Sequence, residues 1–488
     1  MLNLVIASEA KQSSIVPSDR WQVTREGSRC TFSFPRPLFS VTRRISRLNV
    51  LCLLLTAFCF LAACANVPPP TNERPLAPTT NNPIALTLWH AQPDASAALL
   101  DALANDFHKA YPTFTVRVEP KANEGDILRQ GLAAIALNQA PDAVIADNRT
   151  LAEFARRGAL ANLDALLGDA AQGLRDEERA DFFPGLLDAG RFPELKNQIF
   201  AFPFDQSAVV LYYNADLLKA SKADVPRTWE QFSSAARATT RGSTRGWAMS
   251  PNALVFYAFL FSRGGNVLND AQTQAQFGDD AGLKSLQLIV ALTKGGAAYL
   301  ADSAESARAD FAQGKTALLF STTDDLTAIA DAARRANANM QWGVVNIPQN
   351  DATRPFTAMA GADIAIFKPV LSGANGTNEE RVRAAWLFTR WLTEPEQSAR
   401  WSRATLGVPV RLSAQTLLAL NAPPAVLRLR DGFGDALPTG RAAPTVKDAA
   451  LIDAAIVEMW TSVANGADPN PVLKNAAARV NRILGNIP

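Results

Sequence analysis

The chain beyond residue 83 alternates between two hydrophobic periodicities. Ile84 to Trp89 is a short apolar run, which is typical of a strand buried on both faces. The next segment has the apolar spacing of a helix, with Asp94 positioned to cap its start and Pro112 to end it. The expected buried stripe of this helix is Leu99 or Leu100, Leu103, Phe107 and Tyr111. The pattern therefore predicts a strand followed by a helix.

The same alternation continues to residue 149. Phe114, Val116 and Val118 alternate with polar residues, which is the strand pattern. Residues 127–137 are expected to form a helix and residues 143–146 another buried strand. Strands separated by helices indicate parallel pairing through crossovers, so we expect a doubly wound α/β domain. Ligands of such sheets bind outside the carboxyl ends of the strands, where Trp89 and His90 fall and where Asp147, Asn148 and Arg149 fall.

The N-terminal region carries a different hydrophobic pattern. An apolar run at residues 51–60 follows Arg43, Arg44 and Arg47, and residues 61–64 read Leu-Ala-Ala-Cys. A basic segment, a short apolar segment and small residues before a processing point make a secretory signal, and the cysteine resembles that of a bacterial lipobox, in which Cys64 is lipidated. The alternative is a membrane-spanning anchor, but the unbroken stretch is shorter than the roughly 20 apolar residues that a spanning helix needs.

Residues 1–64 are therefore expected to be an N-terminal extension and a lipoprotein signal peptide. Residues 1–42 are longer than a signal's basic segment, which indicates either a start site assigned too early or a genuine cytoplasmic extension. Residues 65–83 are rich in Pro, Asn and Thr and offer little to bury, so they predict a disordered tether. A flexible coil of this length reaches on the order of 25 Å.

Composition narrows the possible functions. The chain is 48% hydrophobic and 19% charged, as in soluble globular proteins, and its net charge of +2 predicts no nucleic-acid footprint. Only His90 and His108 are available as histidines, so we expect no metal and no cofactor, and His108 is expected to be an ordinary exposed residue. Hydrolysis by a carboxylate pair stays open, because acidic residues are plentiful. No disulfide or cysteine nucleophile is expected after residue 64, because the cysteines are Cys30, Cys52, Cys59 and Cys64.

Later motifs carry a family resemblance. Residues 203–205 (Pro-Phe-Asp) lead into residues 211–218 (Leu-Tyr-Tyr-Asn-Ala-Asp-Leu-Leu), and residues 391–397 read Trp-Leu-Thr-Glu-Pro-Glu-Gln. In this order and spacing they resemble the extracellular solute-binding proteins of family 1, the receptors of carbohydrate-type ABC importers, from about residue 84 to residue 484. Residues 88–91 (Leu-Trp-His-Ala) are similar to the glycerol-3-phosphate-binding branch, although sugar binders share much of this segment.

The resemblance implies a two-lobed, periplasmic-binding-protein-like α/β fold of type II, with the ligand cleft between lobes that hinge strands join. Lobe one would comprise residues 84–204 plus 344–398, and lobe two residues 206–342 plus 400–488. The crossovers would lie near residues 204–207, 344–347 and 393–400. The lobes would close around the ligand, and ligand binding would supply the free energy that shifts the open form to the closed one.

Candidate ligand contacts in lobe one follow two strand ends. The indole of Trp89 suits the apolar face of a sugar ring and the imidazole of His90 can donate to a hydroxyl or a phosphate, although both residues also suit a packed core. Asp147, Asn148 and Arg149 offer the paired donors and acceptors that polyol pockets use, whereas Asn148 also suits a plain turn.

The resemblance adds candidates in the hinge and in lobe two. Asp205 and Ser207 occupy the expected hinge, and Asn252 and Tyr257 precede the turn at residues 264–265 in a part of the family that supplies amide and aromatic contacts. Ser321 and Thr322 come where many sugar-binding relatives have a glycine and a tryptophan, which favours a smaller or more hydrophilic ligand. Gly361 lies in residues 359–363, which match a ligand-facing loop, and Arg411 can pair with a phosphate or hold a surface ion pair. The core is expected to hold Tyr212, Tyr213, Trp229, Trp386, Trp391 and Trp401.

These features favour a non-enzymatic receptor that is exported, anchored to the cell membrane by lipid, monomeric, and partnered by a small-molecule solute and ABC permease subunits. A sugar or oligosaccharide is the expected solute, and glycerol 3-phosphate or a glycerophosphodiester is the alternative. A surface-anchored glycosidase and a sensor subunit that reports to a membrane kinase are the other hypotheses.

Overall fold

The computed structural model describes residues 83–337, 339–369, 377–418 and 438–485. The predicted signal peptide, Cys64 and nearly all of the predicted tether lie outside these residues, so they stay predictions. Within the described residues, no helix has both the length and the apolar character of a membrane span.

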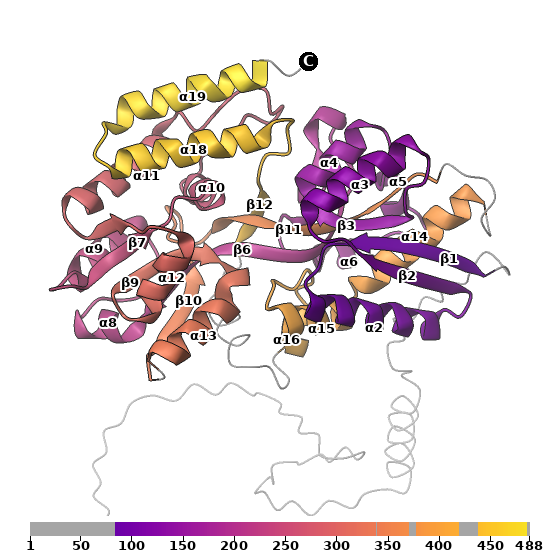
Figure 1. The fold of residues 1–488 in the computed structure, drawn as a ribbon, viewed down its shortest axis with the longest axis horizontal. Helices are drawn as coiled ribbons and strands as arrows, with labels where there is room; N and C mark the ends of the chain where they lie inside the picture. The colour runs from indigo at the N-terminus through magenta and orange to yellow at the C-terminus, as the bar shows by residue number, and fades with distance from the viewer. Residues whose placement is uncertain (1–82, 338, 370–376, 419–437, 486–488) are drawn as a thin grey trace, which may run out of the picture. The chain divides into compact units, whose positions relative to one another are not determined.

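The strands of the described residues are spread along the chain from residue 84 to residue 442 (Figure 1). They are β1 (Ile84–His90), β2 (Phe114–Pro120), β3 (Ala143–Asp147), β4 (Arg191–Phe192), β5 (Gln198–Ile199), β6 (Phe202–Asn214), β7 (Arg245–Met249), β8 (Ala298–Leu300), β9 (Thr316–Thr322), β10 (Trp342–Asn346), β11 (Phe356–Ile366) and β12 (Thr439–Ala442).

Helices separate most of these strands. Those of the first half are α2 (Asp94–Ala110), α3 (Glu124–Ala136), α4 (Asn148–Arg156), α5 (Asp164–Leu167), α6 (Asp176–Ala180), α7 (Leu186–Ala189), α8 (Ala215–Ala220) and α9 (Trp229–Thr239). The remainder are α10 (Ala253–Ser262), α11 (Asp280–Lys294), α12 (Ala304–Ala312), α13 (Leu326–Ala336), α14 (Asn378–Leu392), α15 (Pro395–Thr405), α16 (Ala414–Leu418), α18 (Ala449–Ala464) and α19 (Pro469–Gly485). Two short 3₁₀ helices, η1 (Pro193–Leu195) and η2 (Thr323–Asp325), complete the elements.

Ten of the described strands form one sheet, in the order β2-β1-β3-β11-β6-β9-β7-β8, with β10 beside β6 and β12 beside β11. The pairs β1/β2 and β1/β3 are parallel at one end, and β7/β8 and β7/β9 are parallel at the other. The strands β6 and β11 pair antiparallel with each other in the middle. Parallel units at both ends and antiparallel strands between them give the two-lobed α/β architecture that the sequence predicts.

The two middle strands run from one lobe into the other (Figure 1). The first part of β6 pairs with β11, and its later part pairs with β9 and β10. The strand β11 packs against α10 of the other lobe and pairs with β3 through its last five residues. We therefore name the β1–β3 side lobe one, the β7–β10 side lobe two, and β6 with β11 the hinge strands.

Each lobe has an aromatic core. In lobe one the rings of Phe107, Phe388 and Trp391 pack together, with Phe107 and Phe388 4.9 Å apart between centroids. In lobe two Trp247 and Trp460 join the ring cluster around Phe259 and Phe320. Such ring pairs stabilise a core beyond the apolar area that they bury. Trp386, Trp401, Tyr212 and Trp229 are also buried, as predicted.

Most of the predicted early elements are confirmed, with two corrections. Asp94 does not cap α2: the N-cap is Pro93, and no side chain caps the helix. The strand β1 is not buried on both faces, because its residues alternate between buried and more exposed positions. The predicted lobe boundaries stay predictions; α15 packs against α2, on the lobe-one side of the hinge.

Candidate functional site

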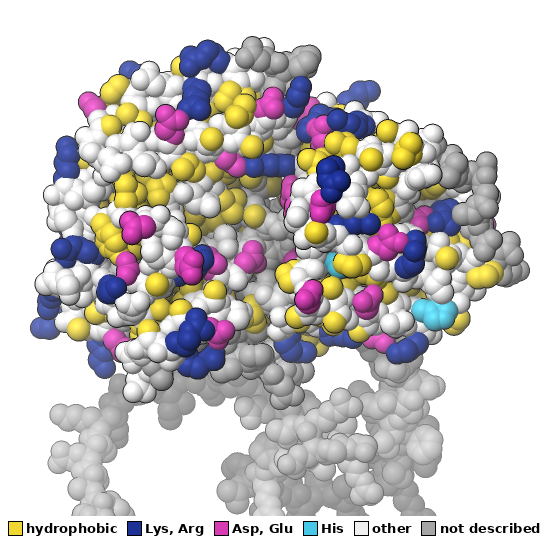
Figure 2. Space-filling view, in the orientation of Figure 1, with side chains coloured by type: hydrophobic (Ala, Val, Ile, Leu, Met, Phe, Trp, Pro, Cys, Tyr) yellow, Lys and Arg dark blue, Asp and Glu magenta, His cyan; other side chains and the backbone are white. Residues whose placement is uncertain are grey.

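A cavity of about 260 Å³ lies where the two lobes and the hinge strands meet, and Figure 2 shows the surface hollowed between the lobes. Lobe one contributes Asp147, Asn148, Arg149 and Ala189. The hinge strands contribute Gln206, Met359, Ala360 and Gly361. The opposite wall consists of Leu254, Tyr257, Ala442, Ala443, Thr445 and Asp453. Apolar walls with a few polar groups are typical of small-molecule sites, and the volume is close to the lower end of their usual range.

The lobe-one wall is the junction of β3 and α4. Asp147 ends the strand and caps the helix, because its Oδ1 accepts from the backbone N–H groups of Arg149 at 2.9 Å and of Thr150 at 3.0 Å. The Asp147 N–H donates in turn to Glu124 Oε2 at 3.3 Å. Burial and the neighbouring Asp147 charge raise the pKa of Glu124 to about 7.

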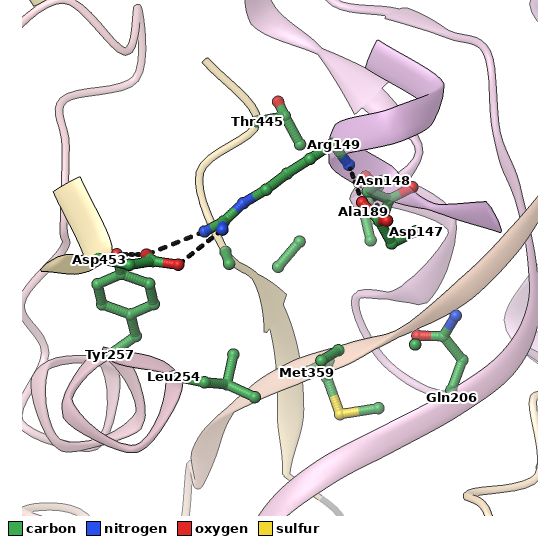
Figure 3. A pocket seen from close by; sticks show the side chains of 14 residues that line it. Asp147, Asn148, Arg149, Ala189, Gln206, Leu254, Tyr257, Met359, Thr445 and Asp453 are labelled. Atoms are coloured by element: carbon green, nitrogen blue, oxygen red, sulfur yellow. Dashed lines mark hydrogen bonds and ion pairs between the residues drawn. The ribbon is translucent and has the colours of Figure 1, made fainter. Parts of the chain in front are cut away.

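An ion pair crosses the cavity from lobe one to lobe two (Figure 3). The Arg149 guanidinium donates from Nη1 and Nη2 to the two carboxylate oxygens of Asp453, at 2.6 and 3.0 Å. The Tyr257 hydroxyl donates to the same carboxylate at 2.5 Å, and Arg149 Nε donates to the carbonyl of Pro444 at 3.2 Å. This bidentate pair is the strong form of an ion pair and fixes the distance between α4 and α18.

The hinge strands form the floor of the cavity. Gln206 Nε2 donates to Asp363 Oδ1 at 2.5 Å, and burial raises the pKa of Asp363 to about 7. Gly361 sits opposite Gln206 in the β6/β11 register and has a φ of 148°. A Cβ at residue 361 would lie 2.0 Å from the Asp205 carbonyl oxygen, so only glycine lets the two backbones approach this closely.

Two buried polar atoms of the wall have no hydrogen-bond partner in the described residues. They are Asn148 Oδ1 and Thr445 Oγ1. Buried polar groups are normally paired, because an unpaired one loses its hydration without compensation. Both atoms are shielded from water by the surrounding protein atoms.

The structure brings together five of the predicted site residues at this cavity, namely Asp147, Asn148, Arg149, Tyr257 and Gly361. Gly361 is not in a loop as expected, because residues 359–363 belong to β11 and pair with the neighbouring strands. The others lie outside the cavity lining, and their predicted ligand roles stay predictions.

Trp89 and His90 end β1 away from the lining. The Trp89 indole N–H donates to Glu119 Oε2 at 2.8 Å, and Lys121 Nζ lies 3.9 Å from the centre of its ring. His90 is buried and accepts from the Gln92 N–H at 3.0 Å through Nδ1, and burial lowers the pKa of this imidazole. Both side chains are engaged by neighbours in lobe one.

Asp205 and Ser207 face away from the cavity. Side chains of a strand alternate between its two faces, so Gln206 points to the cavity and its two neighbours point to the other side. Trp401 Nε1 donates to Asp205 Oδ1 at 3.0 Å, and Thr323 Oγ1 donates to Ser207 Oγ at 3.2 Å. Burial raises the pKa of Asp205.

The remaining predicted residues have local partners. Asn252 caps α10 by accepting from the Leu254 N–H at 2.8 Å, and Ser321 bonds to Asp325. Thr322 ends β9. Arg411 is buried over the Phe182 ring and donates to the Thr393 carbonyl at 2.8 Å, and burial lowers its pKa to about 10.

Sequence reasoning missed the lobe-two partner of Arg149. Asp453 is one acid in a helix with no motif, and nothing in the sequence links it to a residue 304 positions earlier. Gln206 carried a usable signal, because it lies between two predicted hinge residues and alternation puts it on the other face. Met359 belongs to the segment 359–363 that the family resemblance marked, whereas Thr445 gave no signal.

Comparison with known proteins agrees with the fold. Residues 102–427 match the family model described as bacterial extracellular solute-binding protein. The sn-glycerol-3-phosphate-binding periplasmic protein UgpB of Rhizobium meliloti (strain 1021) is 22% identical over 343 residues, covering 67% of this chain and 76% of that protein.

Solved structures share the architecture. The cyclic alpha-maltosyl-1,6-maltose binding protein from Arthrobacter globiformis superposes with a TM-score of 0.69 at 19% identity, covering 83% of this chain and 100% of that one. UgpB from Mycobacterium tuberculosis, solved with glycerophosphocholine, gives a TM-score of 0.62 at 23% identity, covering 83% and 99%. On the strength of the family match, the chain belongs to the bacterial extracellular solute-binding proteins.

Proposed function

We propose that this protein is the membrane-anchored receptor of an ABC importer, which captures a sugar or a short oligosaccharide between its lobes and delivers it to the permease by hinge closure. The observation that carries the proposal is the cavity that both lobes line, with polar residues on both sides. The names of the relatives support the solute class, since they bind maltose-type sugars or sn-glycerol 3-phosphate.

Binding, and no bond cleavage, is the proposed activity. A lipid at Cys64 and the tether of residues 65–83 would keep a monomeric receptor on the outer face of the cell membrane, within reach of the permease. The lobe-crossing Arg149–Asp453 pair supports a hinge mechanism, because a ligand that adds further contacts between the lobes would favour the closed form over the open one.

Ligand binding is testable with the full chain purified in detergent. A panel of neutral mono-, di- and oligosaccharides, polyols and glycerophosphodiesters is screened by thermal shift. A solute at 100 times its Kd adds about 2.7 kcal/mol to the free energy of unfolding. A well-folded protein whose melting temperature no compound raises would contradict the proposal, and turnover of a chromogenic glycoside would favour the glycosidase instead.

A substitution in the lining tests whether the solute binds in this cavity. Asn148→Ala changes the shape and the polarity of the lobe-one wall, so we expect the affinity for the best compound of the panel to fall on the order of tenfold. Isothermal titration measures the change. Asn465→Ala is the control, since Asn465 is exposed beyond the end of α18 and outside the lining. Equal affinities of the two variants would place the ligand elsewhere.

A further inference from the structure

The two features of the cavity that attract anions are both already occupied by carboxylates of the protein itself. The N-terminus of a helix such as α4 and a guanidinium are the usual sites for a phosphate. The Asp147 carboxylate fills the first, where it accepts from the N–H groups of Arg149 and Thr150. The Asp453 carboxylate fills the second, with two hydrogen bonds from the Arg149 guanidinium.

The charge of the lining is therefore not that of an anion site. Its ionisable carboxylates are Asp147 and Asp453, and Arg149 is the one Lys or Arg among the described lining residues. Glu124 stands behind Asp147 and adds a third carboxyl group to the same wall. The side chains of Arg149 and Asp453 are 34% and 30% exposed, so solvent screens their charges only in part.

A phosphate that enters this cavity has to take Arg149 away from Asp453. The displaced carboxylate then keeps only the Tyr257 hydroxyl as a partner and faces the phosphate as a like charge. A polyhydroxyl molecule meets no such conflict. Its hydroxyls can donate to the carboxylates and accept from the guanidinium N–H groups without breaking the pair.

We propose that Asp453 determines the charge of the solute: by holding Arg149, it makes the cavity select uncharged polyhydroxyl solutes and reject those that carry a phosphate. This rests on the proposed receptor function and decides between its two solute classes. The Asn variant of residue 453 has nearly the same shape and keeps an oxygen for Tyr257, but it no longer neutralises Arg149.

The experiment compares D-glucose with D-glucose 6-phosphate, and glycerol with sn-glycerol 3-phosphate, by isothermal titration of the full chain in detergent at low ionic strength. For the wild type we expect the phosphate ester of each pair to bind weaker than its neutral partner or not at all. For Asp453→Asn we expect affinity for the phosphate esters to rise on the order of tenfold or more, since a charge-assisted hydrogen bond becomes available.

Two further variants isolate the cause. The double variant Asp453→Asn/Arg149→Gln should not show the increased affinity for phosphate esters, because the Arg149 guanidinium that binds the ester is absent. Glu458→Gln removes the same charge from the same helix, but Glu458 pairs with Arg479 outside the cavity, so it should leave all affinities unchanged. A gain in Glu458→Gln equal to that in Asp453→Asn would reduce the effect to net charge and overturn the proposal.

The outcomes separate this proposal from the receptor function. Wild-type protein that prefers the phosphate ester overturns the charge proposal and leaves a solute receptor standing. A folded Asp453→Asn protein whose affinity for the phosphate esters does not rise overturns the charge proposal as well. Wild-type protein that binds no sugar of the wider panel contradicts the proposed sugar receptor, while the ester gain of Asp453→Asn still tests the charge proposal. If Asp453→Asn does not fold, the wild-type comparison of each ester with its neutral partner decides.

Discussion

The two faces of β6 at the hinge differ although their residues are neighbours in sequence. On the cavity face, Gln206 lines the cavity and donates to Asp363. On the opposite face, Asp205 accepts from Trp401, and Ser207 accepts from Thr323. The first face borders the cavity, and the second joins the strand to α15 and η2. Of these three neighbouring residues, only Gln206 lines the described cavity.

Gly361→Ala should have the largest effect on stability, because it disturbs the pairing of β11 with β6, the strand that carries both faces. A Cβ at this position meets the Asp205 carbonyl oxygen at 2.0 Å and forces a non-glycine residue to a φ of 148°. We expect the free energy of unfolding to fall by about 3 kcal/mol or more, from strain and crowding together. Urea denaturation measures it.

Gly242→Ala is the matched control for Gly361→Ala. Gly242 also has a positive φ, of 55°, but no atom lies within 4 Å of a Cβ there. It should therefore cost only about 1 kcal/mol. Equal costs for the two substitutions would show that the close approach of β6 and β11 adds nothing.

The buried carboxyl of the floor predicts a pH dependence. The folded pKa of Asp363, about 7, lies above its ordinary value of 3.8, so the folded protein holds a proton that the unfolded chain releases. Asp363 should thus lower the wild-type stability as pH rises from about 4 to about 7, by up to about 1.4 kcal/mol per unit.

Asp363→Asn should abolish this contribution. The difference in free energy of unfolding between wild type and Asp363→Asn, measured in urea at pH 5, 6, 7 and 8, isolates Asp363, because other titrating groups such as His90 and Glu124 are common to both proteins. The free energy of unfolding of the wild type should fall relative to that of Asp363→Asn between pH 5 and pH 7. Above pH 7 the difference between the two proteins should be constant. A flat difference would contradict the raised pKa.

Ser207→Ala should have the smallest effect and tests the opposite face. Removing the hydroxyl takes one acceptor from Thr323 and should cost about 1 kcal/mol of stability. The affinity for the solute should not change, in contrast to the loss expected for Asn148→Ala. A Ser207→Ala protein of wild-type stability but weakened affinity would reverse the comparison of the two faces.

Local hydrophobic patterns predicted most of the early strands and helices. The strands at residues 84–90, 114–120 and 143–147 and the helices between them follow from periodicity alone, because each buries one stripe or one run against its neighbours. Residues 359–363 did not, since a glycine within a short apolar segment suits a loop as well as a strand. Pairing with β6 and β3, which local sequence does not encode, makes it a strand.

The lobe-one wall of the cavity was predictable, whereas of the opposite wall only Tyr257 was predicted. Asp147, Asn148 and Arg149 follow a buried strand, a position where α/β folds bind ligands. Asp453 and Thr445 come from the last tenth of the chain, and only the tertiary fold brings them to the cavity. Trp89 and His90 also follow a strand, but neighbours in lobe one engage both side chains.

The 304-residue separation of Arg149 and Asp453 has a consequence for biosynthesis. The chain is made from its N-terminus, and any fragment that stops before α18 lacks Asp453 and leaves Arg149 without its partner across the cavity. Contacts this distant in sequence form late, since a long loop has to close first. The Arg149–Asp453 pair therefore forms only after α18 has been made and has joined the fold.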